Sequence, residues 1–137
     1  MSLISQILAE TQVIAIVGCS DKMHRTSYQI AAFLQRVGYR VIPVNPRLDH
    51  VLGETCYPSV SAIPAEIRVD LVDIFRQPRY TEAVVEDILM RKAQTNQTPV
   101  VWTQLGVSAE SARQLAESNG LVYIPNRCTL VEYERYA

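Results

Sequence analysis

The sequence predicts an α/β fold of three layers, with helices on both faces of a five-stranded, mainly parallel sheet. Two patterns alternate along the 137 residues of the chain. Short apolar runs rich in β-branched residues are typical of buried strands, and longer segments with an apolar residue every three or four positions are typical of amphipathic helices. Strands that alternate with such helices pair in parallel, and right-handed crossovers place helices on both faces of the sheet.

Five runs are predicted to be strands. The first spans residues 13–18, where VIAIV ends at Gly18, and its continuous apolar character suits burial on both faces. The remaining four cover residues 39–46, 69–75, 98–106 and 120–125.

Two long segments are predicted to be helices. Apolar residues at positions 30, 34 and 37 lie on one face of a helix that begins near Arg25, and Gly38 is a suitable C-terminal stop. A later helix runs to about Gln94, and Pro78 fits its first turn because no N–H donor is needed there.

Shorter helices are predicted at both ends of the chain and after the fourth strand. Residues 3–10 are expected to be helical, and Ser108 is expected to cap a helix. Thr129 and Glu132 have the spacing of a capping box, which predicts a last helix over residues 130–136.

The stretch from 47 to 64 differs from the rest of the chain because it is rich in Pro, Gly and Ser. We expect a loop with one short helix that begins near Ser59. No linker or fixed-period repeat is visible, and 137 residues with 48% hydrophobic content suffice for a single core, so residues 1–137 are expected to form one domain.

Charge and composition exclude several classes of protein. The net charge is −1 and no basic run stands out, which disfavours nucleic-acid binding. The apolar runs are only strand-sized and the N-terminus lacks the pattern of a secretory signal, so we expect no membrane association and a cytoplasmic protein. Three widely separated cysteines predict free thiols and neither a disulfide framework nor a zinc site.

The segment IVGCSDKMHRTS, residues 16–27, is a candidate anion site. Gly18 permits a tight turn, Ser20, Thr26 and Ser27 offer hydroxyl groups, and the free N–H groups that open the next helix favour a negative charge. The same residues also permit a purely structural interpretation, in which Gly18 ends the strand and Thr26 or Ser27 caps the helix.

Two familiar nucleotide motifs are absent. The P-loop pattern needs a second glycine that is missing here, and the dinucleotide fingerprint GxGxxG lacks its second and third glycines. After the second strand stand Asn45 and Arg47, where an NAD site usually carries an acidic residue. A ribose that bears its own phosphate suits Arg47, Arg25 and Lys22 better, which favours NADP or coenzyme A (CoA).

Four stretches, VIAIVGCSDKMHRTSYQIAAFLQRVGYRVIPVNP, VDLVDIFR, VVWTQLGV and NRC, together resemble the small stand-alone CoA-binding proteins. Their domain is similar to the nucleotide-binding domain of the succinyl-CoA synthetase α subunit. The resemblance covers essentially the whole chain. It implies a Rossmann-like fold that binds CoA across the carboxyl ends of its strands.

The resemblance also implies which residues of this chain contact the cofactor. They would lie against the phosphates (Gly18, Ser20, Arg25, Ser27), near the adenosine end (Asn45, Pro46, Arg47), beside the middle of the cofactor (Phe75, Arg76) and on the facing rim (Gln104, Gly106). In the family an aspartate commonly precedes the dipeptide RC, and this chain has Asn126 there. Any role of that carboxylate is therefore in doubt.

No arrangement of residues in the sequence is typical of catalysis. The only histidines are His24 and His50, and Cys128 has no histidine near it in sequence to act as a base. We therefore expect a protein that binds CoA or an acyl-CoA through a phosphate-binding loop, without catalysis of its own. Two alternatives stay open, an NADP-binding or other nucleotide-dependent enzyme, and a regulatory or partner subunit of an acyl-CoA-processing enzyme. A homo-oligomer is equally open.

Overall fold

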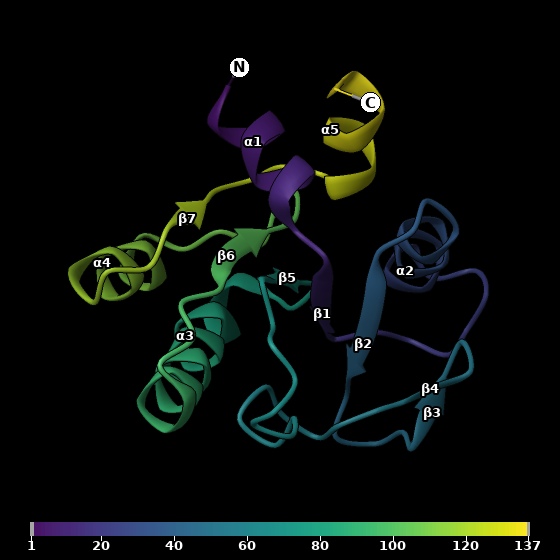
Figure 1. Cartoon of the computed structure of the whole chain (residues 1–137), viewed down its shortest axis with the longest axis horizontal. Coiled ribbons are helices and arrows are strands. Elements are labelled where there is room, and N and C mark those ends of the chain that lie inside the picture. The colour runs from purple at the N-terminus through teal and green to yellow at the C-terminus, as the bar shows by residue number, and fades with distance from the viewer. Residues whose placement is uncertain (1, 137) are drawn as a thin grey trace.

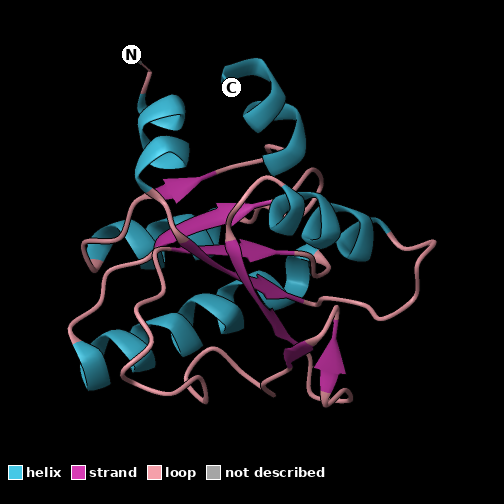
Figure 2. Ribbon diagram, turned by 45° about the vertical axis from the view of Figure 1, so that its right-hand side comes forward, coloured by secondary structure: helices cyan, strands magenta, loops and turns pink. Residues whose placement is uncertain are grey.

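The computed structural model describes residues 2–136 and confirms the predicted class. A five-stranded sheet has the order β2-β1-β5-β6-β7, and all of its neighbouring strands are parallel. The strands are β1 (Val13–Val17), β2 (Arg40–Val44), β5 (Leu71–Ile74), β6 (Val100–Thr103) and β7 (Tyr123–Ile124). Figure 1 shows the strands as the central layer, and Figure 2 shows the helices that cover them.

The five helices divide between the two faces of the sheet. They are α1 (Leu3–Glu10), α2 (Thr26–Arg36), α3 (Pro78–Thr95), α4 (Glu110–Ser118) and α5 (Thr129–Tyr136). Buried residues of α3 and α4 pack with one face, and buried residues of α1 and α2 pack with the other, which α5 also covers. The predicted helices at 3–10, 25–37 and 78–94 are confirmed, with ends shifted by no more than one residue.

Strand β1 shows why the sheet needs a continuous apolar run. Ile14 and Ile16 join the core on the side of α1, α2 and α5, whereas Ala15 and Val17 join the core on the side of α3 and α4. Successive side chains of a strand point to opposite faces, so a strand covered on both faces has no position for an exposed polar residue. Trp102 of β6 is fully buried, and its indole Nε1 donates a hydrogen bond to the Arg127 carbonyl at 2.8 Å.

The prediction for residues 47–64 was wrong in two respects. No helix begins near Ser59, and a small antiparallel hairpin forms instead from β3 (His50–Val51) and β4 (Glu54–Thr55). Two side chains of α3 hold the following residues in turns. The Asp87 carboxylate accepts hydrogen bonds from the amides of Val60 and Ser61, at 2.7 and 3.3 Å. It thereby acts on these amides as the side chain of an N-cap residue acts on the first amides of a helix.

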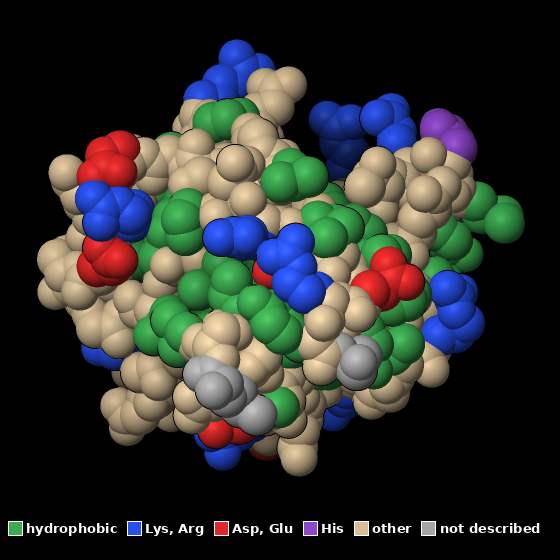
Figure 3. All heavy atoms as spheres, turned by 90° about the horizontal axis from the view of Figure 1, so that it is seen from above, with side chains coloured by type: hydrophobic (Ala, Val, Ile, Leu, Met, Phe, Trp, Pro, Cys, Tyr) green, Lys and Arg blue, Asp and Glu red, His purple; other side chains and the backbone are tan. Residues whose placement is uncertain are grey.

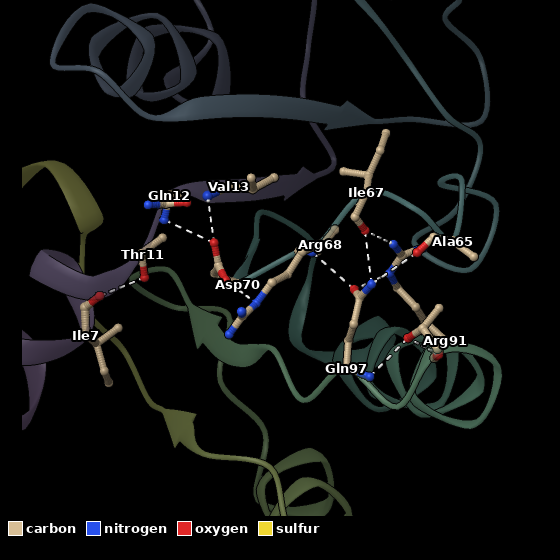
Figure 4. A network of polar contacts seen from close by, with 12 residues as sticks. Ile7, Thr11, Gln12, Val13, Ala65, Ile67, Arg68, Asp70, Arg91 and Gln97 are labelled. Atoms are coloured by element: carbon tan, nitrogen blue, oxygen red, sulfur yellow. Dashed lines mark hydrogen bonds and ion pairs between the residues drawn. The ribbon is translucent and has the colours of Figure 1, made fainter.

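Arg91, one turn further along α3, fixes the rest of this segment. Its fully buried guanidinium donates to the carbonyls of Ile63 (2.6 Å), Pro64 (3.1 Å) and Ile67 (2.5 Å). Its Nε donates to the Gln97 side chain, as Figure 4 shows among the other polar contacts of this region. Burial lowers the pKa of Arg91. The guanidinium carries five donors in one plane, and these match carbonyls that have no partner in a strand or a helix. We call residues 58–67 the clamped segment.

Both predicted helix caps were also wrong, because each hydroxyl binds a more distant partner. Helix α4 has Ala109 as its N-cap, and the Ser108 Oγ lies 2.9 Å from the Tyr123 hydroxyl instead. Helix α5 begins at Thr129 itself, whose hydroxyl donates to the Asp73 carboxylate at 2.8 Å. Asp73 is fully buried in β5, and this burial raises its pKa to about 8. The hydroxyl therefore stabilises a carboxyl group that has little other support.

The face with the two termini is formed by α1 and α5. Figure 3 looks onto this face and shows hydrophobic side chains over much of its centre, with separate Lys and Arg side chains between them. Leu3, Val131 and Tyr136 are among the exposed apolar residues of these helices. No helix within residues 2–136 combines the length and the apolar character that a bilayer crossing requires.

A candidate ligand cleft at the carboxyl edge of the sheet

A cleft of about 590 Å³ opens where β1, β2 and β5 end and α2 begins. We call it the carboxyl-edge cleft. The sequence predicted seven of its lining residues as cofactor contacts, namely Gly18, Ser20, Arg25, Ser27, Asn45, Arg47 and Phe75. Lys22 and Thr26, which the sequence also indicated as partners for an anion, line it too. Parallel strands place their carboxyl ends at one edge, and this arrangement brings together residues from separate parts of the chain.

A smaller hollow of about 270 Å³ adjoins the cleft at Gly18. Two further predicted residues, Pro46 and Arg76, line it. Arg76 and Arg79 both stack on the ring of Tyr80, with guanidinium carbons 4.6 and 4.9 Å from the ring centroid. The cation–π contact with Tyr80 holds Arg76 beside this mostly apolar depression.

Gln104 and Gly106 line neither hollow and lie in the turn that follows β6. The Gly106 amide donates to the Asn126 side-chain oxygen at 2.8 Å, which joins this turn to the segment before α5. Gln104 is only 6% exposed, and its Oε1 has no hydrogen-bond partner within the described residues. A buried acceptor without a partner is uncommon in folded proteins, so this oxygen is available to a donor on a ligand or a water molecule.

Gly18 is required by two independent features of the backbone. Its φ of +83° lies in the region that side chains with a Cβ rarely adopt. A Cβ at this position would lie 2.3 Å from the Phe75 carbonyl oxygen, far inside van der Waals contact. Gly18 therefore does more than end the strand, because it lets the turn after β1 touch the turn after β5 and closes the floor of the cleft.

The hydroxyl groups of the loop shape it from within. The Ser20 amide donates to the Ser27 Oγ, and the Lys22 amide donates to the Ser20 Oγ, both at 3.0 Å. Asn45 joins the neighbouring turn to this loop, because its Nδ2 donates to the Cys19 carbonyl and its Oδ1 accepts from the Arg47 amide. These three side chains hold the two turns in register.

The first turn of α2 offers unused donors to the cleft. Within residues 2–136 the amides of Thr26, Ser27 and Tyr28 have no hydrogen-bond acceptor, and the N-cap residue Arg25 contributes no side-chain cap. Free amides at a helix N-terminus carry partial positive charge and form a natural anion site. The alternative prediction that Thr26 or Ser27 caps this helix is therefore wrong.

Three cations add to the positive character of the cleft. Lys22, Arg25 and Arg47 are exposed, and none of them forms an ion pair with a carboxylate in the described part of the chain. Asp21 also lines the cleft and partly offsets their charge. The net balance favours a ligand with more than one negative charge.

The cysteine nearest the cleft is not a candidate nucleophile. Cys19 is fully buried and burial, with smaller contributions from Cys56 and Asp21, raises its pKa to about 12. A thiol with such a pKa stays protonated at neutral pH and reacts slowly. The structure confirms that Cys19, Cys56 and Cys128 are free thiols.

Some residues of the two hollows were not predicted from the sequence. Asp21 and Leu48 line the cleft but have no side-chain chemistry that singles them out. Tyr80 lines the smaller hollow and contacts Arg76, but Arg76 precedes the N-cap Gln77, so helical spacing does not predict this contact.

The fold and this cleft define a class of protein, a Rossmann-like domain with a cationic crevice at the carboxyl edge of its sheet. A family model described as CoA binding domain matches residues 12–134, which is most of the chain. The chain belongs to this family.

Relatives support this membership. Protein YneT of Bacillus subtilis, described as uncharacterized, is 35% identical over 130 residues, which is 95% of this chain and 91% of YneT. A solved structure of a hypothetical protein from Pyrococcus horikoshii is 37% identical, with a TM-score of 0.87 over 97% of this chain and 89% of that one. ADP-forming acetate–CoA ligase II of Archaeoglobus fulgidus is 23% identical over 88% of this chain, which spans only 19% of the ligase.

Proposed function

We propose that the protein binds coenzyme A, or an acyl-CoA, in the carboxyl-edge cleft. The observation that carries this proposal is the convergence of three unpaired cations with the free amides of α2 in one cleft of a CoA-binding-domain protein. CoA presents a diphosphate and a separate phosphate on its ribose. A ligand with two anionic centres fits a cleft in which amides and side-chain cations lie at different positions.

The two anionic centres are assigned to different residues. In this proposal the diphosphate lies against the first turn of α2, where the amides of Thr26, Ser27 and Tyr28 are free. The ribose phosphate lies near Arg47, whose backbone is held by the Asn45 side chain. Gln104 lines neither hollow and is given no contact with the cofactor in this proposal.

The role we propose is binding without catalysis. The ligases of Archaeoglobus fulgidus carry CoA in their names, but this chain spans only 19% of one of them. Within residues 2–136, the cysteine beside the cleft is a buried thiol with a pKa of about 12. The proposal therefore covers the cofactor and leaves the ligase reaction to those larger proteins.

Isothermal titration with CoA, dephospho-CoA and NADP tests the proposal. CoA should bind with the highest affinity, and loss of the ribose phosphate should weaken binding by about tenfold, as expected for a charge-assisted contact of about 1.4 kcal/mol. Preference for NADP over CoA would instead identify a nucleotide-dependent enzyme. Absence of CoA binding at high micromolar concentration would reject the proposal.

Two variants locate the contacts. Arg47→Ala should weaken CoA more than dephospho-CoA, whereas Arg25→Ala should weaken both equally if its guanidinium contacts the diphosphate. Arg36→Ala removes an exposed arginine at the other end of α2, away from the cleft, and should leave both affinities unchanged. Equal behaviour of Arg47→Ala and Arg36→Ala would remove Arg47 from the site.

A second candidate role is that of a partner subunit. The observation in its favour is that the same domain forms one fifth of an acetate–CoA ligase, joined there to further sequence. Affinity purification of the tagged protein from its own cell extract, in the presence of CoA, should then recover a CoA-dependent companion chain. Recovery of the protein alone would count against this role.

A further inference from the structure

A second hollow lies at the opposite edge of the sheet, where the strands begin. Its volume is about 440 Å³, and it is formed by the end of α1, the residues before β5 and the residues between α3 and β6. Three of its lining residues precede position 12, where the match to the family model starts. We call it the amino-edge hollow. It is separate from the carboxyl-edge cleft and shares no lining residue with it.

One wall of the hollow carries the guanidinium of Arg68, whose side chain is 85% exposed. The Arg68 Nε lies 3.2 Å from the Asp70 Oδ1. The other oxygen of Asp70 accepts hydrogen bonds from the amides of Gln12 and Val13, at 3.0 and 2.9 Å, which fixes the carboxylate at the start of β1. Figure 4 shows Arg68 reaching past Asp70 toward the end of α1. Its two terminal nitrogens have no partner within residues 2–136, so they remain free for a carboxylate.

A negative group lines the same hollow without neutralising Arg68. Glu10 of α1 accepts one hydrogen bond from the Gln6 side chain at 3.1 Å, and no ion pair joins Glu10 to Arg68 in the described part of the chain. Since Asp70 already balances Arg68, the three groups together carry one negative charge. A doubly charged anion such as a phosphate is therefore disfavoured. A ligand with an ammonium group for Glu10 and a carboxylate for the terminal nitrogens of Arg68 matches both groups.

The remaining lining residues are apolar or neutral. Ile7 and Val69 are buried, and Val100 is half-buried at the start of β6. Asn96 is exposed, and its side-chain amide has no hydrogen-bond partner within residues 2–136. No group of three His, Cys, Asp or Glu residues in that range is arranged to hold a metal ion. Opposite charges on the rim and aliphatic side chains inside indicate a small amphipathic zwitterion.

We propose that the amino-edge hollow binds a free α-amino acid with an aliphatic side chain. The carboxylate of the ligand pairs with the terminal nitrogens of Arg68, and its ammonium group pairs with Glu10. The aliphatic side chain contacts Ile7, Val69 and Val100. The planar guanidinium accounts for the choice of a carboxylate, because it bonds both carboxylate oxygens at once.

Two-dimensional NMR titration with L-leucine at millimolar concentration tests this proposal. The side-chain amide signal of Asn96 and the backbone signals of Arg68 and Asp70 should shift in a saturable way. N-acetyl-L-leucine lacks the ammonium group and L-leucinamide lacks the carboxylate, and each should bind about tenfold more weakly, as expected for loss of a charge-assisted hydrogen bond. Absence of saturable shifts, or equal binding of the three compounds, would overturn the proposal.

Matched variants separate charge from folding. Glu10→Gln keeps the shape of the side chain, and Arg68→Gln shortens the side chain but keeps it polar. Each variant should weaken L-leucine by about tenfold. Glu66→Gln removes an exposed carboxylate that does not line the hollow and should bind as the unchanged protein does. Binding by Arg68→Gln equal to that of Glu66→Gln would also overturn the proposal, provided that both retain the melting temperature of the unchanged protein.

The same variants keep this inference independent of the proposed CoA site. Arg68→Gln should leave CoA affinity unchanged, because the amino-edge hollow and the carboxyl-edge cleft lie at opposite ends of the strands. A protein that binds L-leucine but not CoA would reject the proposed function and keep this inference, and the reverse result would do the opposite.

Discussion

Two irregular segments differ in how their polar groups are satisfied. In the clamped segment, residues 58–67, Asp87 takes up two backbone amides and Arg91 binds the carbonyls. In the loop of residues 18–27, serine hydroxyls hold the turn, but the amides that open α2 remain free. A loop whose polar groups are all satisfied supports structure, whereas a loop with fixed but unused donors is prepared for a ligand.

The largest expected effect comes from breaking the clamped segment. Arg91→Met removes a buried guanidinium that donates to several carbonyls and leaves the Ile63 carbonyl without any other donor within residues 2–136. It should lower the free energy of unfolding by about 4 kcal/mol, measured by urea denaturation. Lys92→Met, at the next position of α3, is the control and should change stability little. An unchanged unfolding midpoint for Arg91→Met would show that water replaces the guanidinium.

The second prediction breaks the open loop. Gly18→Ala places a Cβ against the Phe75 carbonyl and demands an unfavourable φ, so it should cost about 3 kcal/mol of stability and abolish CoA binding. Gly53→Ala is the matched control, because Gly53 has a similar φ of +77° and no atom within 4 Å of its Cβ position. It should cost only about 1 kcal/mol. Equal losses in the two variants would refute the steric role of Phe75.

The third prediction concerns the carboxyl group of Asp73, which is buried and has only a partial set of hydrogen bonds. One oxygen of Asp73 accepts from Thr129, and the other has no hydrogen-bond partner among residues 2–136. Burial raises the pKa of Asp73 from 3.8 to about 8. The folded protein therefore binds a proton that the unfolded chain releases between these values. Stability from this group is present below pH 3.8 and is lost as the pH rises to about 8.

Asp73→Asn isolates this effect. The difference in melting temperature between the variant and the unchanged protein should grow in favour of the variant as the pH rises from 4 to 8, because asparagine cannot ionise. Contributions from all other titrating groups cancel in the difference. A difference that does not depend on pH would show that Asp73 is already ionised in the folded state.

The smallest effect is expected at Asn126, which the resemblance singled out because the family commonly has aspartate there. Its side-chain oxygen accepts from the Gly106 amide, and a carboxylate oxygen accepts the same bond. Asn126→Asp should change stability by about 0.5 kcal/mol or less, as measured by thermal unfolding. A larger loss would show that the amide nitrogen of Asn126 also matters for the turn.

Elements with a local cause were predictable from the sequence. The apolar positions of α2 and α3, the proline at the start of α3 and the continuous strands all follow from periodicity within a few residues of each other. Seven predicted contact residues line one cleft for a similar reason, because strand ends in a parallel sheet meet at one edge. Their binding of CoA stays a prediction.

Elements with a distant cause were not predictable. Ser59 resembles a helix start, but the partners that shape its segment stand on α3 and are visible only in three dimensions. The same holds for the hydroxyls of Ser108 and Thr129, because they bind Tyr123 and Asp73, which are distant in the sequence, and do not cap their helices. Gln104 and Gly106 lie outside both hollows, because the turn after β6 is joined to Asn126 and not to the turns after β1 and β2.

The Arg91 clamp also bears on the order in which the chain folds. The clamped segment has no ladder of its own, and three of its carbonyls accept hydrogen bonds from Arg91, on a helix that comes later in the sequence. Its ordering must therefore wait until α3 has docked on the sheet, which places it among the last events on the folding pathway. Amide protons of this segment would then be the first to exchange when α3 transiently detaches, well before the central strands open.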